Sequence, residues 1–214
     1  MIKNILLFFT LIFFSACSFQ SPPNDWQYKS VSAFEAYTQN FLGANDAIAK
    51  NDLKRAVEHA KQGADLKTLS NIYLAKCALN ISVGVNDECQ EYQEISSLVE
   101  DSPSEAYFAF IQHKRDYDIS KLDASYKNFA LSLKKQDYTK ANQYIKSIEK
   151  PTSKLLAAAL IKDKLTIKTR EDMINVASFN GYKKSALFWL NEKLFYTKDI
   201  NEREKLLRKI EILK

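Results

Sequence analysis

The sequence predicts an all-α protein, and three observations support this prediction. Only four glycines and four prolines occur in 214 residues, so few positions interrupt a helix through their own conformational preference. Alanine, leucine and lysine, which favour helices, are abundant. Alternation of β-branched and polar residues, the pattern of a half-buried strand, is nearly absent. We therefore expect nine or ten helices joined by short loops, with neighbouring helices packed as stacked antiparallel hairpins.

Signals for helix ends recur along the chain. Residues 32–35 (SAFE) and 102–105 (SPSE) have the spacing of a capping box, the second with proline at the first helical position. A weaker version begins at Thr169. Gly63 follows a long amphipathic stretch and predicts a left-handed residue that ends a helix. Further N-caps are expected at Asn51 with Asp52, at Asp65 and at Asp87.

The N-terminus has the three-part pattern of an export signal. Lys3 gives a positive start, residues 5–14 are apolar apart from Thr10, and the small residues Ser15 and Ala16 follow. This apolar run is about half the length of roughly 20 residues that a helix needs to cross a bilayer. We therefore expect residues 1–16 to be a cleaved signal peptide and not a stable transmembrane anchor.

Cys17 stands at the border between this signal and the soluble sequence. The stretch Phe14-Ser15-Ala16-Cys17 resembles the lipobox of bacterial lipoproteins, with Phe14 in place of the usual Leu, Val or Ile. The resemblance implies cleavage before Cys17, a diacylglycerol on its sulfur and a further acyl chain, such as palmitate, on its amine. Several acyl chains exceed what stable membrane anchoring requires. The alternatives are a free thiol after ordinary cleavage and a buried structural cysteine.

The residue after Cys17 bears on the choice of membrane. Ser18 stands where an aspartate in enteric bacteria resembles an inner-membrane retention signal. The resemblance to lipoproteins therefore implies the outer membrane, with the protein facing the periplasm.

The mature sequence divides into a tether and a body. Residues 17–29 are mostly polar, contain the adjacent prolines Pro22 and Pro23 and lack helical or strand periodicity. We expect them to form a lipidated N-terminus and flexible tether. Residues 30–214 are enough for one substantial apolar core, so we expect a single all-α domain there.

Three ten-residue stretches of the body align without gaps: NDLKRAVEHA from position 51, QDYTKANQYI from 136 and NGYKKSALFW from 180. Each sets a large residue three positions before a small one, which is Ala56, Ala141 or Ser185. The large residue can fill a helical hairpin while the small one lets the backbones approach. The pattern resembles the second helix of the tetratricopeptide repeat. The resemblance implies an α-solenoid of stacked hairpins, and an irregular helical bundle is the alternative.

Cys77 and Cys89 are the other two cysteines. Export places them in an oxidising compartment, where disulfides persist. We expect a bridge from near the end of one helix, across the turn at 82–86, to the first turn of the next helix; two free buried thiols are the alternative. The Cys-x-x-Cys spacing is absent, and His59 and His113 are isolated, so we expect no metal site and no cofactor.

Motifs for catalysis or nucleic-acid binding are not found. The sequence contains neither a Gly-rich phosphate loop nor a Gly-x-Ser-x-Gly elbow. Loss of Lys3 with the signal lowers the formal charge from +5 to +4, and basic residues are interleaved with acidic ones. A protein that binds nucleic acid typically has a concentrated basic face, and the sequence does not indicate one. We expect a protein that is not an enzyme.

The membrane anchor and the repeats together favour an adaptor. A superhelix of hairpins has a concave face on which aromatic side chains can bind partners; the candidates are Tyr37, Tyr73, Tyr107, Tyr144 and Trp189. The helix around Trp189 is apolar on all sides, which also fits a buried core helix. The expected function is a lipid-anchored scaffold for envelope proteins. A cell-wall hydrolase resembling lytic transglycosylases and a carrier of lipid or small ligands remain alternatives.

Overall fold

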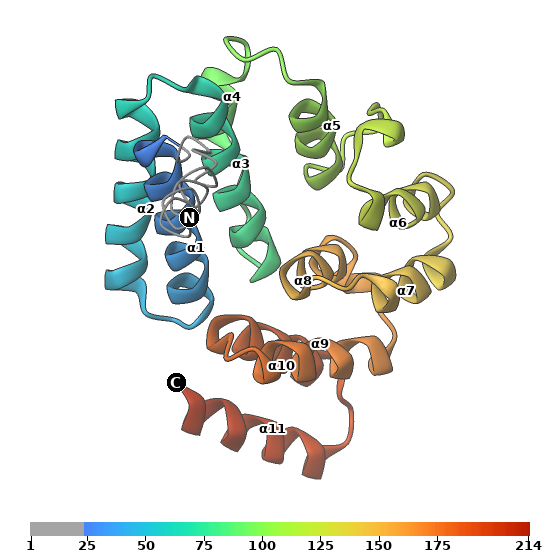
Figure 1. Cartoon of the computed structure of the whole chain (residues 1–214). Coiled ribbons are helices and arrows are strands. Elements are labelled where there is room, and N and C mark those ends of the chain that lie inside the picture. The colour runs from blue at the N-terminus through green and yellow to red at the C-terminus, as the bar shows by residue number, and fades with distance from the viewer. Residues whose placement is uncertain (1–23) are drawn as a thin grey trace, which may run out of the picture.

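The computed structural model describes residues 24–214, and within that range it contains helices and no strand (Figure 1). The all-α prediction is confirmed. The α-helices are α1 (Asp25–Leu42), α2 (Asp46–Gln62), α3 (Leu66–Ser82), α4 (Gln90–Ser96), α5 (Ser102–Ile111), α6 (Ala124–Lys134), α7 (Tyr138–Ser147), α8 (Pro151–Leu160), α9 (Ile167–Phe179), α10 (Lys183–Tyr196) and α11 (Ile200–Leu213). Two short 3-10 helices, η1 (Ile119–Lys121) and η2 (Lys162–Lys164), lie between them.

The helices follow a ring-like path (Figure 1). In this view α1 and α2 stand on one side, α5 and α6 on the other, and α3 and α8 between them, with α9 to α11 below. The arrangement closes on itself because α3 packs against α8 and α1 packs against α10. Lys184 of α10 forms an ion pair with Asp46 of α2, and its ammonium lies 4.0 Å from the centre of the Phe41 ring. These contacts therefore join α10, near the end of the chain, to α1 and α2 at the start of the described range.

One continuous apolar core reaches every α-helix of the described range, from Tyr37 in α1 to Ile210 in α11. Its largest fully buried side chains include Phe110, Phe129 and Trp189. A smaller cluster joins α1, α2 and α3 and consists of Ala33, Ala56, Ala60, Leu69 and Ile72. Because the main core is shared along the whole chain, the helices form one packed body.

Six helix ends share one turn geometry. A residue with positive φ follows the helix, and the N–H group of the next residue donates to the carbonyl oxygen five positions back, as in the Schellman motif. The positive-φ residues are Ala44, Ala64, Gly84, His113, Gln136 and Gly181. In all but the turns at Gly84 and His113 the next α-helix begins two residues later. The same short connection thus produces the hairpins α1–α2, α2–α3, α6–α7 and α9–α10.

The predicted helix ends are partly confirmed. Asp65 caps α3 by accepting hydrogen bonds from the N–H groups of Lys67 and Thr68, and α5 begins with the expected stretch 102–105. Residues 32–35 are no cap, since they lie inside α1. Near the third candidate, Thr166 is the residue that caps α9. A capping-box pattern is short, so a helix can continue past it when tertiary packing stabilises the turns on both sides.

Asn51 and Asp52 were predicted to begin a helix, and this prediction is wrong. Both lie in the middle of α2, which starts at Asp46. Asp52 is only 4% exposed; it accepts a hydrogen bond of 2.8 Å from the Asn40 side chain of α1 and pairs with Arg55. Its carboxylate is therefore satisfied by tertiary contacts in place of the free backbone N–H groups of a helix start.

Gly63 ends α2 as expected but not through a left-handed backbone. Its φ is −77°, and Ala64 adopts the left-handed conformation instead. A Cβ atom on Gly63 would lie 2.5 Å from the ring of Trp26, so the glycine provides room for that ring. This contact supports the first turn of α1, which begins at Asp25, five residues before the expected start of the helical body at position 30.

The three aligned stretches also differ. The copies from 136 and 180 begin at left-handed turns that lead into α7 and α10, whereas the copy from 51 lies within α2. The three small residues are all fully buried: Ala56, Ala141 and Ser185. The second helices of α1–α2, α6–α7 and α9–α10 therefore each bury a small residue, as expected for a point of helix contact.

Candidate functional site

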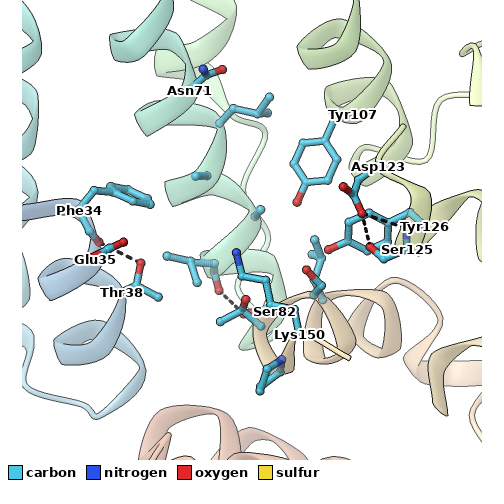
Figure 2. Close-up of a pocket in the computed structure, with 18 of the residues that line it drawn as sticks. Phe34, Glu35, Thr38, Asn71, Ser82, Tyr107, Asp123, Ser125, Tyr126 and Lys150 are labelled. Atoms are coloured by element: carbon cyan, nitrogen blue, oxygen red, sulfur yellow. Dashed lines mark hydrogen bonds between the residues drawn. The ribbon is translucent and has the colours of Figure 1, made fainter. Parts of the chain in front are cut away.

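A groove lies at the centre of the ring of helices. Its volume is about 1580 Å³, and most of the residues that line this central groove belong to α1, α3, α5, α6 and α8 or the turns beside them. In Figure 2 the ring of Phe34 extends into the groove from α1, Tyr107 and Tyr126 lie on the opposite side, and Lys150 points in from below. Pockets for small molecules usually measure about 300–1,000 Å³. The central groove is large enough to hold a section of a polymer.

The floor of the central groove is one face of α3. Asn71, Ala75, Ala78 and Ser82 line it, at spacings of four, three and four residues, which places them on one side of a helix. The last three have very small side chains, so little rises from α3 to fill the opening. Leu74 adds apolar surface beside them. The small residues of α3 therefore help to keep the groove open.

Tyr107 and Tyr126 form an aromatic wall. Their ring centroids lie 5.9 Å apart, and both rings pack against Phe110 behind them. Burial raises the pKa of Tyr126 to about 12 and that of Tyr107 well above its usual value of 10.0, because loss of water disfavours the phenolate. Both hydroxyl groups therefore stay protonated at neutral pH.

Charged side chains are few around the central groove. Two are positive and three negative, a formal balance of −1: Lys121, Lys150, Glu35, Asp123 and Glu149. Asp123 caps α6 and accepts hydrogen bonds of 2.6 and 2.9 Å from the hydroxyl and N–H groups of Ser125. The hydroxyl bond, followed by the N–H bond, lowers the pKa of Asp123 below its usual 3.8. Asp123 is thus an ionised capping group and is poorly suited to donate a proton in catalysis.

Only one of the five predicted groove residues lines the central groove, and that residue is Tyr107. Tyr37 is 4% exposed, with its ring centroid 5.4 and 5.5 Å from those of Phe34 and Phe41, and Trp189 is fully buried. Tyr73 and Tyr144 are half-buried against the core and do not line the groove. The prediction that these side chains bind a partner is therefore wrong for Tyr37 and Trp189, which are buried, whereas Tyr73 and Tyr144 lie away from the central groove.

The sequence reasoning missed Phe34, Tyr126 and Tyr182, which all line the central groove. Aromatic type alone could not separate them from core residues, because which side of a helix faces the groove depends on tertiary packing. One usable signal was present: α3 carries the stripe Asn71, Ala75, Ala78 and Ser82 within an otherwise apolar stretch. A small, partly polar stripe on a core helix indicates a face that is left uncovered.

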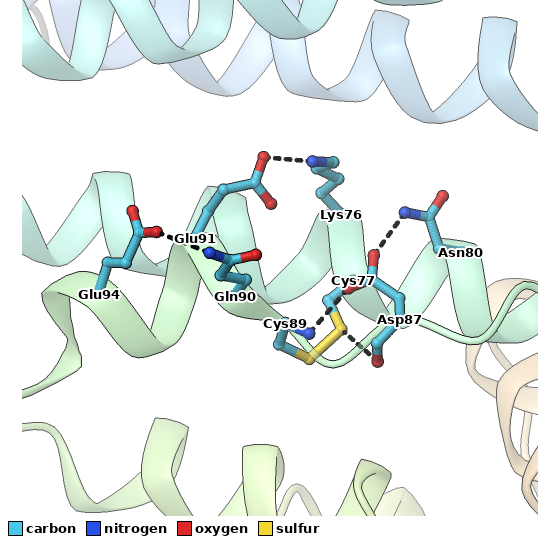
Figure 3. A network of polar contacts seen from close by, with 8 residues as sticks. All are labelled: Lys76, Cys77, Asn80, Asp87, Cys89, Gln90, Glu91 and Glu94. Atoms are coloured by element: carbon cyan, nitrogen blue, oxygen red, sulfur yellow. Dashed lines mark hydrogen bonds and ion pairs between the residues drawn. A yellow bond between two sulfur atoms is a disulfide. The ribbon is translucent and has the colours of Figure 1, made fainter.

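The predicted disulfide between Cys77 and Cys89 is present (Figure 3). Both residues are 1% exposed. The bridge joins α3 to the residue that precedes α4, and the Asp87 side chain supports it by accepting from Cys89 N–H at 2.7 Å and from the Asn80 amide at 2.6 Å. The Gln112 amide from the end of α5 donates to the Asp87 carbonyl oxygen at 2.8 Å. The bridge thus anchors the turn between α3 and α4.

One group of three potential metal ligands occurs among residues 24–214, and it contains this bridge. Cys77, Asp87 and Cys89 bring their ligand atoms within 4.8 Å of one another. Because the two sulfur atoms are bonded to each other, neither is a thiolate, which is the form that binds metals. The His59 ring forms a hydrogen bond of 3.1 Å with the Gln62 side chain. The geometry favours a structural role for the group.

The predicted lipidation residue, Cys17, and the signal at 1–16 lie outside the described residues. Within residues 24–214, no helix combines the length and apolar character needed to cross a membrane. In comparisons with protein-family models, with curated proteins and with solved structures, nothing matches this chain significantly. Its function is therefore inferred from the sequence pattern and the central groove.

Proposed function

We propose that the chain is a lipid-anchored, non-enzymatic adaptor of the bacterial cell envelope. Its lipid is attached at Cys17, its body faces the periplasm from the outer membrane, and the central groove holds an elongated partner. The observation that carries the proposal is the groove itself: about 1580 Å³ of open space lined by several helices. Such a space exceeds the usual pocket for a small molecule of about 300–1,000 Å³.

The distance between lipid and body supports this arrangement. Helix α1 begins at Asp25, eight residues after Cys17 in the sequence. Eight extended residues span at most roughly 25–30 Å, which is short compared with a long flexible linker. The body would be kept close to the membrane surface, where attachment raises the effective concentration of a partner in the same envelope. An adaptor gains affinity in this way without new contacts.

The groove provides a direct test. A photo-crosslinking amino acid is introduced at position 75, on the groove floor, and separately at position 47, an exposed alanine of α2 that does not line the groove. The protein is expressed at native level in intact cells, irradiated, and examined for species of higher mass. We expect a reproducible crosslinked product from position 75 and none from position 47.

The outcome is independent of the partner's chemical class. Sensitivity of the product to proteases or to cell-wall hydrolases then indicates whether the partner is a protein or a glycan. Recovery of the uncrosslinked chain alone from position 75 would reject the adaptor function.

A further inference from the structure

Hydroxyl side chains are concentrated on the central groove. Eleven of the 29 residues that line it are Ser, Thr or Tyr, compared with 33 of the 191 residues that the structure describes. Only five of the 29 are charged, a smaller share than the 27% of the whole sequence. The groove is therefore rich in hydroxyl groups and poor in charge, and these properties restrict the kind of ligand that it fits.

A hydroxyl group both donates and accepts hydrogen bonds. An array of such groups complements a ligand whose own groups also do both, whereas nucleic acids and acidic peptides favour concentrated positive charge. The balance of two positive and three negative side chains at the groove supplies no such charge. The matching ligand is a polyhydroxylated molecule without a strong charge.

Tyr182 adds a hydroxyl that a ligand could use. The residue as a whole is 7% exposed, it lines the central groove, and its hydroxyl forms no hydrogen bond with another residue in the range 24–214. Thr152 and Ser32 also line the groove without a side-chain hydrogen bond to another described residue. Because no other described residue uses these hydroxyl groups, they can donate hydrogen bonds to a ligand and accept hydrogen bonds from it.

The remaining surfaces of the groove are apolar or aromatic. Ala75, Ala78 and Leu74 of the floor present methyl groups, and Phe34 and Tyr107 present rings. An acetamido group offers a methyl for the floor and an amide that can pair with Asn71. The flat C–H face of a sugar ring can pack on an aromatic ring. These surfaces match a chain of N-acetylated sugars.

We propose that the central groove binds a glycan strand of N-acetylated sugars, the polymer of the bacterial cell wall. This inference rests on the proposed function, because it names the partner that the groove of the adaptor holds. Bound in this way, the protein would join the outer membrane, through its lipid, to the cell wall, through its groove. No bond in the glycan is broken.

The test uses the mature full chain with Cys17→Ser, which is soluble if the lipid alone anchors it. A hexamer of β-1,4-linked N-acetylglucosamine is titrated by calorimetry, beside a glucose hexamer that lacks acetamido groups. Ala75→Trp places a bulky ring on the groove floor, Ala47→Trp is the matched control on α2, and Tyr182→Phe removes one hydroxyl while keeping the ring. Circular dichroism verifies that each variant is folded.

We expect saturable binding of the N-acetylated hexamer and at least tenfold weaker binding of the glucose hexamer. Ala75→Trp should weaken binding more than tenfold, Tyr182→Phe by about three- to tenfold, as for loss of one hydrogen bond, and Ala47→Trp by less than twofold. No binding to the folded parent, or equal binding by Ala75→Trp, would overturn the glycan proposal.

Isolated cell walls distinguish a glycan from a peptide. Walls from which the stem peptides have been removed should retain the protein, and binding should disappear after the glycan strands are digested. If binding is lost when the peptides are removed, the occupant is a peptide and the glycan proposal is wrong. A crosslink from position 75 would in that case still support the adaptor, so the two proposals fail separately.

Discussion

Gly84 connects two parts of the chain that are distant in sequence. It follows α3 with a φ of +81°, and a Cβ atom built on it would lie 2.2 Å from the Phe188 ring of α10. Gly181 has a similar φ of +69°, but nothing lies within 4 Å of its Cβ position. Gly181 is therefore required only for its left-handed backbone, whereas Gly84 is required for its left-handed backbone and for its close contact with Phe188.

Replacing each glycine by alanine tests this distinction. Gly181→Ala should lower the free energy of unfolding by about 1 kcal/mol, the cost of a left-handed alanine. Gly84→Ala should lower the free energy of unfolding by that amount and by roughly a further 1–3 kcal/mol, because the new methyl group overpacks against Phe188. Urea unfolding of both variants measures the difference. Equal losses would show that Phe188 does not pack on Gly84 as described.

Asp65 gives a pH-dependent prediction. The Thr68 N–H bond, followed by other hydrogen bonds, lowers its pKa below the usual 3.8, so its stabilisation is present above that value and is lost as the pH falls through the folded pKa. Asp65→Ala should cost about 1 kcal/mol at pH 7. The difference in the free energy of unfolding between parent and variant should decrease below about pH 4. Urea unfolding at pH 7, 5 and 3 checks this; a constant difference would contradict the capping role.

Single residues show where sequence reasoning succeeds and where it stops. The cap at Asp65 was predictable because all its hydrogen-bond partners lie within three residues. Asp52 looked the same in the sequence, yet its partner Asn40 lies on another helix. Gly63 was correctly placed at a helix end for the wrong reason, because its contact with Trp26 spans 37 positions. Local interactions are readable in the sequence, and distant ones are not.

At the scale of elements, the disulfide fixes the connection between α3 and α4. Cys77 and Cys89 are 12 residues apart in sequence, and a closed loop of this size stabilises the folded state by about 3 kcal/mol in the chain-entropy model. Reductant should lower the free energy of unfolding of the parent by roughly that amount and leave the double variant Cys77→Ala, Cys89→Ala unchanged. Two thiols that react with an alkylating agent without reductant would contradict the bridge.

The helices themselves were largely predictable, whereas their faces were not. Composition and local caps indicate helices whatever surrounds them, and the small residues Ala56, Ala141 and Ser185 are buried, as expected for points of helix contact. Four of the helix turns place non-glycine residues at positive φ, which no local signal marks. Tyr37 and Tyr107 are alike in the sequence, but only Tyr107 lines the groove. That difference arises when α3 meets α8 and the ring closes.

At the scale of the whole molecule, the proposed lipid and the groove have separate roles. Cys17→Ser should move the protein from the membrane fraction to the soluble fraction, because the proposed acyl chains would be lost and no helix within residues 24–214 can span the bilayer. Fractionation followed by immunoblotting measures this. The groove variant Ala75→Trp is the control and should stay with the membrane. Retention of the Cys17→Ser protein would show that the anchor lies elsewhere.

The central claim is that the groove of the anchored protein is occupied by an envelope partner. The most direct test is gradient sedimentation of the lipidated protein after mild detergent extraction of envelopes. The parent and Ala47→Trp should sediment in a fast fraction with the partner, and Ala75→Trp should sediment as a single mature chain, which is smaller than the 24.6 kDa of the full sequence because residues 1–16 are removed. Identical slow sedimentation of all three, or fast sedimentation of Ala75→Trp, would contradict the account.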